Sequence, residues 1–170
     1  AEDTPFNQKF VARLFERWQM NAVMVENGQE AVAKLAEQPF DMVLMDVQMP
    51  VMDGFEATRL IRKKETENDL PHIPIIAMTA HAMKGDKERC LESGMDGYVS
   101  KPISPELLRA EIIKFSPADL IRTQPAAPVP SPAEPPAENS FEPEKLMRAF
   151  DDDMEFLKEA VGMFLEDYPQ

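Results

Sequence analysis

The chain has 170 residues, 44% of them apolar, and a formal net charge of −13 at pH 7. This length allows one domain of ordinary size plus a smaller part, and the apolar content is sufficient for a buried core. The acidic charge disfavours direct binding to nucleic acid or anionic lipid, because phosphate contacts need clustered Lys and Arg. A metal cation or a basic partner fits this charge better.

Two further features bear on the cellular setting. No apolar run approaches the roughly 18 residues of a membrane span, and the single cysteine, Cys90, cannot form an internal disulfide. We therefore predict a cytoplasmic setting with no membrane contact by this segment, whereas a longer parent protein can still be anchored in the inner membrane.

The first forty residues alternate helical and strand patterns. Apolar residues in 5–18 recur at helical spacing, and Pro5 is tolerated in the first turn, so we predict a helix there. Residues 22–25 are predicted to form a strand. The Asn27-Gly28 turn then leads into a second predicted helix at 29–37.

The next stretch, DMVLMDVQMPVMDG, carries the central strand. The unbroken apolar run 42–45 lies between two Asp residues, which predicts a short strand buried on both faces of a parallel sheet. The strand ends at Asp46, and Pro50 keeps the following loop out of helix. Because ligands of open α/β sheets bind beyond the carboxyl ends of the strands, Asp46 presents its carboxylate at a crevice.

The alternation continues to residue 115. The predicted elements are a helix capped by Asp53, a strand at 73–78, a helix at about 83–91, a strand at 98–100 and a helix at 105–115. The polar run 63–69 is predicted to carry the chain across the surface. This order predicts an α/β fold with a doubly wound parallel sheet.

The composition changes after residue 115. Residues 116–140 contain seven prolines, which predicts a stiff Pro/Ala-rich linker. Residues 141–170 predict two short amphipathic helices that are too short to bury their own apolar stripe. The predicted organisation is thus a domain at 1–115, a linker at 116–140 and an incomplete all-α part at 141–170.

Polar side chains meet at one edge of the predicted sheet: Glu2, Asp3, Asp46, Thr79 and Lys101. Three carboxylates so close together repel one another, and a hard divalent cation such as Mg²⁺ resolves the conflict. Lys101 and Thr79 could each contact an oxygen of a phosphoryl group, which leaves Asp46 as the nucleophile. The predicted chemistry is phosphoryl transfer.

The motifs that carry these residues resemble the receiver domain of bacterial response regulators, and most closely that of hybrid sensor histidine kinases. They are ENGQEAV, MDVQMPVMDG, the MTA at 78–80 and SGMDGYVSKP. The resemblance covers residues 1 to about 115 and implies a flavodoxin-like fold with strand order 2-1-3-4-5. The family's first strand is absent here except for Ala1, so we expect this sequence to be a fragment.

The resemblance assigns a role to each residue at the predicted site. It implies that Asp46 is the phospho-acceptor, that Thr79 and Tyr98 are the switch pair and that Lys101 contacts the phosphoryl group. It also implies a cis Lys101-Pro102 bond. The implied Mg²⁺ ligands are Glu2, Asp3, Asp46 and the backbone carbonyl of Gln48.

The implied function is phosphorelay signalling. A phosphohistidine, on a histidine kinase core or a histidine phosphotransfer domain, donates to Asp46, and the receiver helps to catalyse its own phosphorylation and dephosphorylation. The parent would be a histidine kinase whose kinase core is not in this chain. Residues 141–170 resemble the opening helices of a histidine phosphotransfer domain, but they contain no phosphorylatable His.

Two alternatives stay open. An aspartate-nucleophile phosphohydrolase would be expected to carry a second Asp two residues after the first, where this chain has Gln48. A degenerate receiver that only binds partners would be expected to lose Asp46, Lys101 or the acidic pair.

The first helix carries a wide apolar stripe. At about 100° per residue, Val11, Leu14, Phe15 and Trp18 are predicted to face the sheet. Phe6 and Phe10 fall toward its edge, and we predict that they are partly exposed and form a docking patch for a four-helix phosphotransfer domain.

Overall fold

The computed structural model describes residues 1–80 and 84–116, with side chains omitted at 84–87. The predicted linker and the incomplete helical part lie almost entirely outside the described residues. The described elements are α1 (Pro5–Arg17), α2 (Gly28–Glu37), β1 (Val43–Asp46), α3 (Gly54–Glu67), β2 (Ile75–Thr79), α4 (Lys84–Glu92), β3 (Gly97–Ser100) and α5 (Pro105–Phe115).

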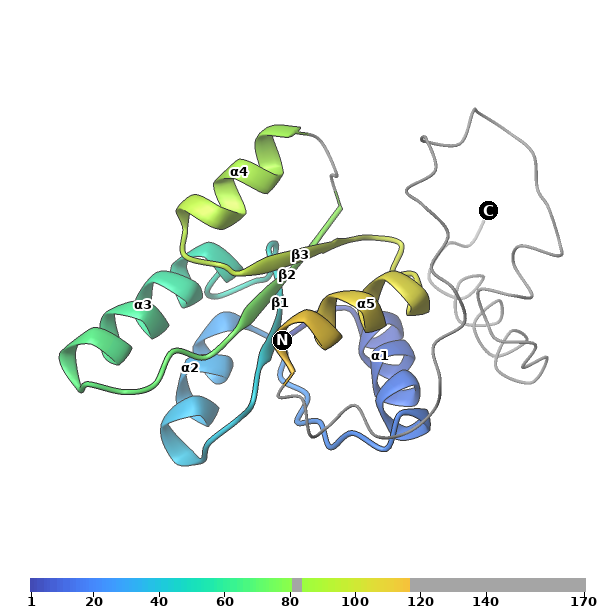
Figure 1. Cartoon of the computed structure of the whole chain (residues 1–170), viewed down its shortest axis with the longest axis horizontal. Coiled ribbons are helices and arrows are strands. Elements are labelled where there is room, and N and C mark those ends of the chain that lie inside the picture. The colour runs from blue at the N-terminus through green and yellow to red at the C-terminus, as the bar shows by residue number, and fades with distance from the viewer. Residues whose placement is uncertain (81–83, 117–170) are drawn as a thin grey trace, which may run out of the picture. The chain divides into compact units, whose positions relative to one another are not determined.

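The three strands form one parallel sheet in the order β1-β2-β3. Helices α1 and α5 lie on one side of it, and α2, α3 and α4 lie on the other (Figure 1). The predicted α/β fold with helices on both faces of a parallel sheet is therefore confirmed. Among the described helices, none is both long and apolar enough to cross a membrane.

The first two residues of the chain lie at the edge of this sheet. The Ala1 nitrogen donates to the Leu44 carbonyl at 2.7 Å, and the Ala1 carbonyl accepts from the Asp46 nitrogen at 3.0 Å. On the other side the Glu2 nitrogen donates to the Val25 carbonyl at 3.0 Å. This short backbone stretch thus bridges β1 and the segment that ends at Val25.

The predicted strand at 22–25 is not formed. A strand needs a repeated ladder of hydrogen bonds with its neighbour, and Glu2 supplies the bond at Val25. The AVMV run has β preference, but among the described residues it forms no repeated ladder.

The core lies on both faces of the sheet. Its centre is formed by side chains that are almost completely buried: Met45, Ile75, Ile76, Met78 and Leu108. Cys90 is also buried, as a small apolar residue. Because β2 is buried at every position, it reads as a continuous apolar run rather than as an alternating one.

Two helices begin at side-chain caps. The Asn27 side chain accepts from the Glu30 nitrogen at 2.9 Å, and Asp53 accepts from the Glu56 nitrogen at 2.7 Å. Each bond satisfies one of the free amides of a helix start. The predicted cap at Asp53 is confirmed, and it fixes α3 directly after the loop that follows Asp46.

The polar run 63–69 lies mostly at the surface, as predicted, and most of it belongs to α3, which continues to Glu67. The helix is prolonged because Arg62 and Glu65 project from its last two turns into a network with the loops that precede β2 and β3. Polar composition did not reveal this tertiary anchoring.

The buried face of α1 differs from the predicted one. Phe10 is only 8% exposed and is buried with Val11 and Leu14, while Phe15 and Trp18 are half-buried, with ring centroids 6.0 Å apart. The prediction that Phe10 is partly exposed is therefore wrong, and its ring supports the fold rather than a docking patch. With six apolar residues in the helix, spacing alone did not fix which part of the stripe faces inward.

Candidate functional site

Three carboxylates gather at the carboxyl end of β1. Glu2, Asp3 and Asp46 each place one oxygen in a group whose members all lie within 4.8 Å of one another. Asp46 and Glu2 are each only 3% exposed, whereas Asp3 is exposed. The backbone pairing of Ala1 with β1 creates this arrangement, because it holds the acidic pair next to the last residue of the strand.

Lys101 points into the same group. Its Nζ lies 2.7 Å from Asp46 Oδ2 and 2.8 Å from Glu2 Oε2. The Lys101 backbone nitrogen donates to the Thr79 carbonyl at 2.7 Å, so the side chain leaves from directly beside the end of β2. The Lys101-Pro102 bond is cis, which confirms the prediction.

The electrostatics of the site are set by burial and by the contacts of Lys101 with two of the three carboxylates. Burial raises the pKa of Asp46; the hydrogen bond from Lys101 opposes this rise, and the Glu2 carboxylate adds to it. Burial alone would lower the pKa of Lys101, but its contacts with Asp46 and Glu2 outweigh burial and raise it. Lys101 is thus held charged, while ionised Asp46 is held in an unfavourable environment.

The donor set fits a hard divalent cation. Glu2 Oε1 accepts from Asn7 Nδ2 at 2.9 Å, but the buried Glu2 Oε2 has the Lys101 ammonium as an ion-pair partner and no well-oriented hydrogen-bond donor in the described part of the chain. A buried oxygen without such a donor is costly. Carboxylate oxygens are the ligands that Mg²⁺ prefers, and a cation among them would relieve both the repulsion and the unsatisfied oxygen.

A cavity of about 550 Å³ opens beside the carboxylates. Asp3, Gln48 and Thr79 line it. Thr79 ends β2 with its side chain buried, and the Gln48 nitrogen donates to Asp46 Oδ1 at 3.1 Å. Tyr98 is half-buried on β3, where it lies opposite Ala77 in the strand register, two positions before Thr79. All of the predicted site residues except the two Phe therefore stand at this edge of the sheet or next to it.

The loop between β1 and α3 is fixed at several points. The Val47 nitrogen donates to the Met78 carbonyl at 3.0 Å, the Gly54 nitrogen to Val47 at 3.1 Å, and the Gly28 nitrogen to Met52 at 3.0 Å. Gly54 packs so closely on β1 that a Cβ there would stand 2.2 Å from the Asp46 carbonyl oxygen. The loop that carries Gln48 is therefore locked against three neighbouring elements.

Sequence reasoning missed the residues that hold the acidic pair. Asn7 Nδ2 and the Thr4 nitrogen both donate to Glu2 Oε1, and Gln8 Nε2 donates to the Glu2 carbonyl at 2.6 Å. The signal was available, because polar amides in the first turn of α1 come directly after Glu2-Asp3. These bonds fix one Glu2 oxygen and leave the other facing Lys101.

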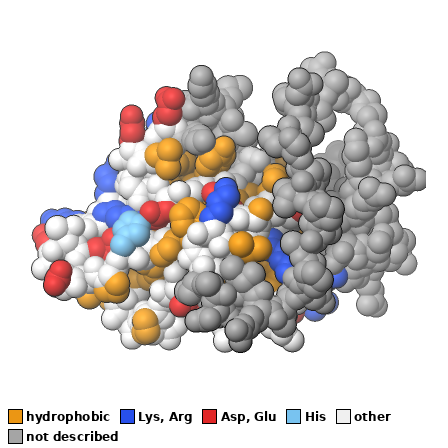
Figure 2. Space-filling model, in the orientation of Figure 1, with side chains coloured by type: hydrophobic (Ala, Val, Ile, Leu, Met, Phe, Trp, Pro, Cys, Tyr) orange, Lys and Arg blue, Asp and Glu red, His pale blue; other side chains and the backbone are white. Residues whose placement is uncertain are grey.

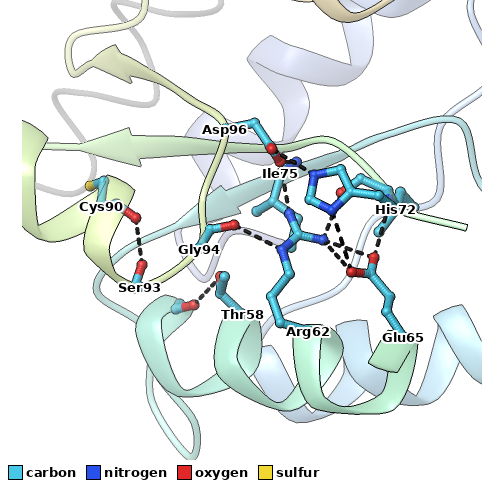
Figure 3. Close-up of polar contacts among 11 residues, drawn as sticks. Thr58, Arg62, Glu65, His72, Ile75, Cys90, Ser93, Gly94 and Asp96 are labelled. Atoms are coloured by element: carbon cyan, nitrogen blue, oxygen red, sulfur yellow. Dashed lines mark hydrogen bonds and ion pairs between the residues drawn. The ribbon is translucent and has the colours of Figure 1, made fainter. Parts of the chain in front are cut away.

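A second polar cluster, at the amino ends of β2 and β3, was also missed (Figure 3). Arg62 donates to Glu65, Asp96 and the Gly94 and Ile73 carbonyls, and His72 lies 2.7 Å from Asp96. Figure 2 shows a histidine at the surface with acidic and basic side chains beside it. This cluster joins α3 to two loops and lies at the opposite edge of the sheet from Asp46.

The family described as the response regulator receiver domain matches residues 1–113. The chain belongs to this family. It carries a receiver domain of the kind found in the hybrid histidine kinases of phosphorelay signalling.

The related proteins are much longer than this chain. It is similar to "Hybrid signal transduction histidine kinase I" of Dictyostelium discoideum, with 48% identity over 113 residues that cover 64% of this chain and 6% of the relative. It is also similar to "Sensor protein GacS" of Pseudomonas syringae pv. syringae, with 45% identity over 116 residues that cover 68% of this chain and 13% of the relative. The chain therefore spans only a small part of these proteins.

Two solved receiver structures are informative. The receiver domain of sensor histidine kinase PA1611 from Pseudomonas aeruginosa PAO1 has a magnesium ion coordinated in its active site cleft; it matches with a TM-score of 0.58 and 38% identity, over 65% of this chain and 88% of that one. The receiver domain of Ssk1 from Saccharomyces cerevisiae, crystallised with the histidine phosphotransfer protein Ypd1, matches with a TM-score of 0.61 and 32% identity, over 64% of this chain and 79% of that one.

Proposed function

We propose that this receiver domain accepts a phosphoryl group on Asp46 in a Mg²⁺-dependent phosphorelay. The observation that carries the proposal is the position of the Asp46 carboxylate, which is buried at the end of β1 and bound by the Lys101 ammonium at 2.7 Å. Val47 and Gln48, the next two residues, line the cavity through which a donor would enter. Glu2 is less suited to attack, because Asn7 and Thr4 already bind one of its oxygens.

The chain's own residues divide the chemistry among them. Asp46 attacks the phosphorus of a phosphohistidine, so that a new O–P bond forms while the P–N bond breaks and its electron pair returns to the imidazole. Lys101, held charged by its carboxylate partners, and the Thr79 hydroxyl bind oxygens of the transferring group. Mg²⁺, held by Glu2, Asp3, Asp46 and the Gln48 carbonyl, would neutralise charge on that group.

The cellular context is part of the same proposal. We propose that the donor is the phosphohistidine of a kinase core or of a histidine phosphotransfer domain, as the complex of the Ssk1 receiver with Ypd1 suggests. The parent protein would be a hybrid histidine kinase that holds this segment in the cytoplasm. Phosphorylation would then shift the Thr79 and Tyr98 region between two arrangements. Phe6, half-buried in the first turn of α1, stays a proposed docking residue, and Phe10 does not.

The intact carboxylate cluster argues against a degenerate receiver that only binds partners. The phosphohydrolase alternative lacks its second acid, since Gln48 occupies that place and contributes a backbone amide to Asp46. Neither alternative has an observation of its own in its favour.

The test is phosphorylation of the purified chain by a small phosphodonor, followed by intact mass measurement. The wild type should gain one phosphoryl group with Mg²⁺ present and none with EDTA. Asp46→Asn should gain none, whereas Asp41→Asn, an exposed Asp just before β1, should react like the wild type. A phosphorylated Asp46→Asn variant would overturn the assignment of the acceptor.

A further inference from the structure

The cavity beside the acceptor has a second wall. On one side it is lined by Asp3, Gln48 and Thr79, and on the other by Phe55, Arg89 and Cys90. Phe55 belongs to the first turn of α3, and Arg89 belongs to the last turns of α4. Two helices that contribute nothing to the carboxylate group therefore help to enclose the space in which a donor must lie.

Arg89 is held in place over an aromatic ring. Its guanidinium carbon stands 5.2 Å from the centroid of the Phe55 ring, within the range of a cation–π contact. Phe55 directly follows Gly54, whose nitrogen is bonded to Val47 and whose backbone packs on the Asp46 carbonyl. The position of the guanidinium is thus tied, through one ring, to the end of the strand that carries the acceptor.

The charge of Arg89 is opposite to that of the acidic residues that line the cavity. Apart from Arg89, the charged residues that line the cavity in the described part of the chain are acidic, namely Asp3 and Asp53. Arg89 is therefore the one basic side chain among the described residues of the cavity lining, and it can attract an anion into an otherwise acidic space.

We propose that Arg89, positioned by Phe55, is a specificity residue that favours phosphodonors whose leaving group is an anion, such as acyl phosphates. The proposal rests on the proposed function of Asp46 as the acceptor. In an in-line displacement the leaving group departs on the side of phosphorus that faces away from Asp46, which is toward the cavity. Arg89 can bind a departing carboxylate there with charge-assisted hydrogen bonds.

Two small donors separate this contribution from the chemistry at Asp46. With acetyl phosphate, the O–P bond to Asp46 forms while the bond from phosphorus to the acyl oxygen breaks, and acetate leaves with the electron pair as an anion. With phosphoramidate, the P–N bond breaks and the protonated nitrogen leaves with the electron pair as neutral ammonia. Both donors place the same phosphoryl group against Asp46 and Lys101, but only acetate offers a carboxylate to Arg89.

The experiment measures the phosphorylation rate constant with each donor, in Mg²⁺, for the wild-type chain and for variants. Arg89→Met should lower the ratio of the acetyl phosphate rate to the phosphoramidate rate by roughly three- to tenfold. Arg109→Met, the same charge change at an exposed position of α5, should leave the ratio unchanged. Arg89→Lys keeps the charge and should retain part of the preference, because Lys is a point charge without the planar fork of Arg.

The outcomes are distinguishable. An unchanged ratio in Arg89→Met, or an equal loss with both donors, overturns the specificity role even though Asp46 remains phosphorylated. If neither donor phosphorylates the wild type, it is the proposed function that fails. If Arg89→Met does not fold by circular dichroism, Arg89→Lys and Phe55→Leu decide: an unchanged ratio in both overturns the role, and a lowered ratio in either supports it.

Discussion

Replacing Arg62 by Met should strongly destabilise the domain while leaving the acceptor site chemically intact. The Arg62 side chain is only 18% exposed and uses all three of its nitrogens. Nε donates to the Gly94 carbonyl at 2.8 Å, Nη1 to Glu65 and the Ile73 carbonyl, and Nη2 to Asp96 at 2.7 Å. Met fills most of the aliphatic space but provides none of these donors.

The magnitude follows from what is left behind. Removing one member of a buried ion pair costs about 3–5 kcal/mol, because the partner charge stays buried. Glu65 and Asp96 keep bonds to the Ile73 and Ile75 nitrogens, which reduces the cost, while two carbonyls lose a donor at roughly 1 kcal/mol each. We expect a net loss of about 2–4 kcal/mol in the free energy of unfolding.

Urea denaturation followed by circular dichroism measures this loss. The matched control is Arg59→Met, which makes the same change at an exposed position of the same helix and should stay within about 0.5 kcal/mol of wild type. A loss in Arg62→Met below about 1 kcal/mol, or one no larger than in Arg59→Met, would show that the network is a surface feature of little energetic weight.

The remaining predictions concern the acceptor site. Because the pKa of Asp46 is raised on folding, the stability that it contributes is present below its unfolded value of 3.8 and is lost as the pH rises through the folded value. In EDTA, Asp46→Asn should therefore have a higher melting temperature than wild type, and the difference should be larger at about pH 7 than at about pH 4. A difference that is larger at about pH 4 would show that the ionised Asp46 carboxylate is not in an unfavourable environment. Mg²⁺ should raise the melting temperature of wild type, by an amount equivalent to about 1.4 kcal/mol at ten times its Kd, and should raise that of Asp3→Asn less; equal shifts would exclude Asp3 as a ligand. Gly54→Ala should cost about 1–3 kcal/mol by urea denaturation, because its Cβ would meet the Asp46 carbonyl oxygen; a variant as stable as wild type would show that α3 can move away from β1.

Much of the site was predictable from the sequence because each of its residues ends a strand. Parallel strands bring their carboxyl ends to one edge, so the order of Asp46, Thr79 and Lys101 along the chain was enough to place them together. Glu2 and Asp3 were placed with them although no predicted strand precedes them; in the structure the pairing of Ala1 with β1 holds them there. The supporting bonds from Asn7 and Gln8 were not predicted, although the amide side chains in the first turn of α1, close after Glu2, offered a signal for them.

The errors have a common physical origin in tertiary contacts. Helix α3 extends through the polar run because Arg62 finds partners more than thirty positions away, in Gly94 and Asp96. Phe10 is buried because the rotation of α1 is set by what packs against it, and a stripe of six apolar residues permits several rotations. Local sequence patterns predict the presence of a helix or strand more reliably than they predict where it ends or which of its faces is buried.

The fixed loop between β1 and α3 restricts which elements of the domain can move when Asp46 is modified. Because this loop is fixed on one side of Asp46, we expect a change at the carboxylate to displace the residues on its other side. Gly54 fixes the loop against α3, and the bond from the Gly28 nitrogen to the Met52 carbonyl fixes it against α2. Under the function proposed for Asp46, we expect its modification to act through Thr79 at the end of β2, and we expect a partner that reads this state to contact the β2 and β3 side of the domain.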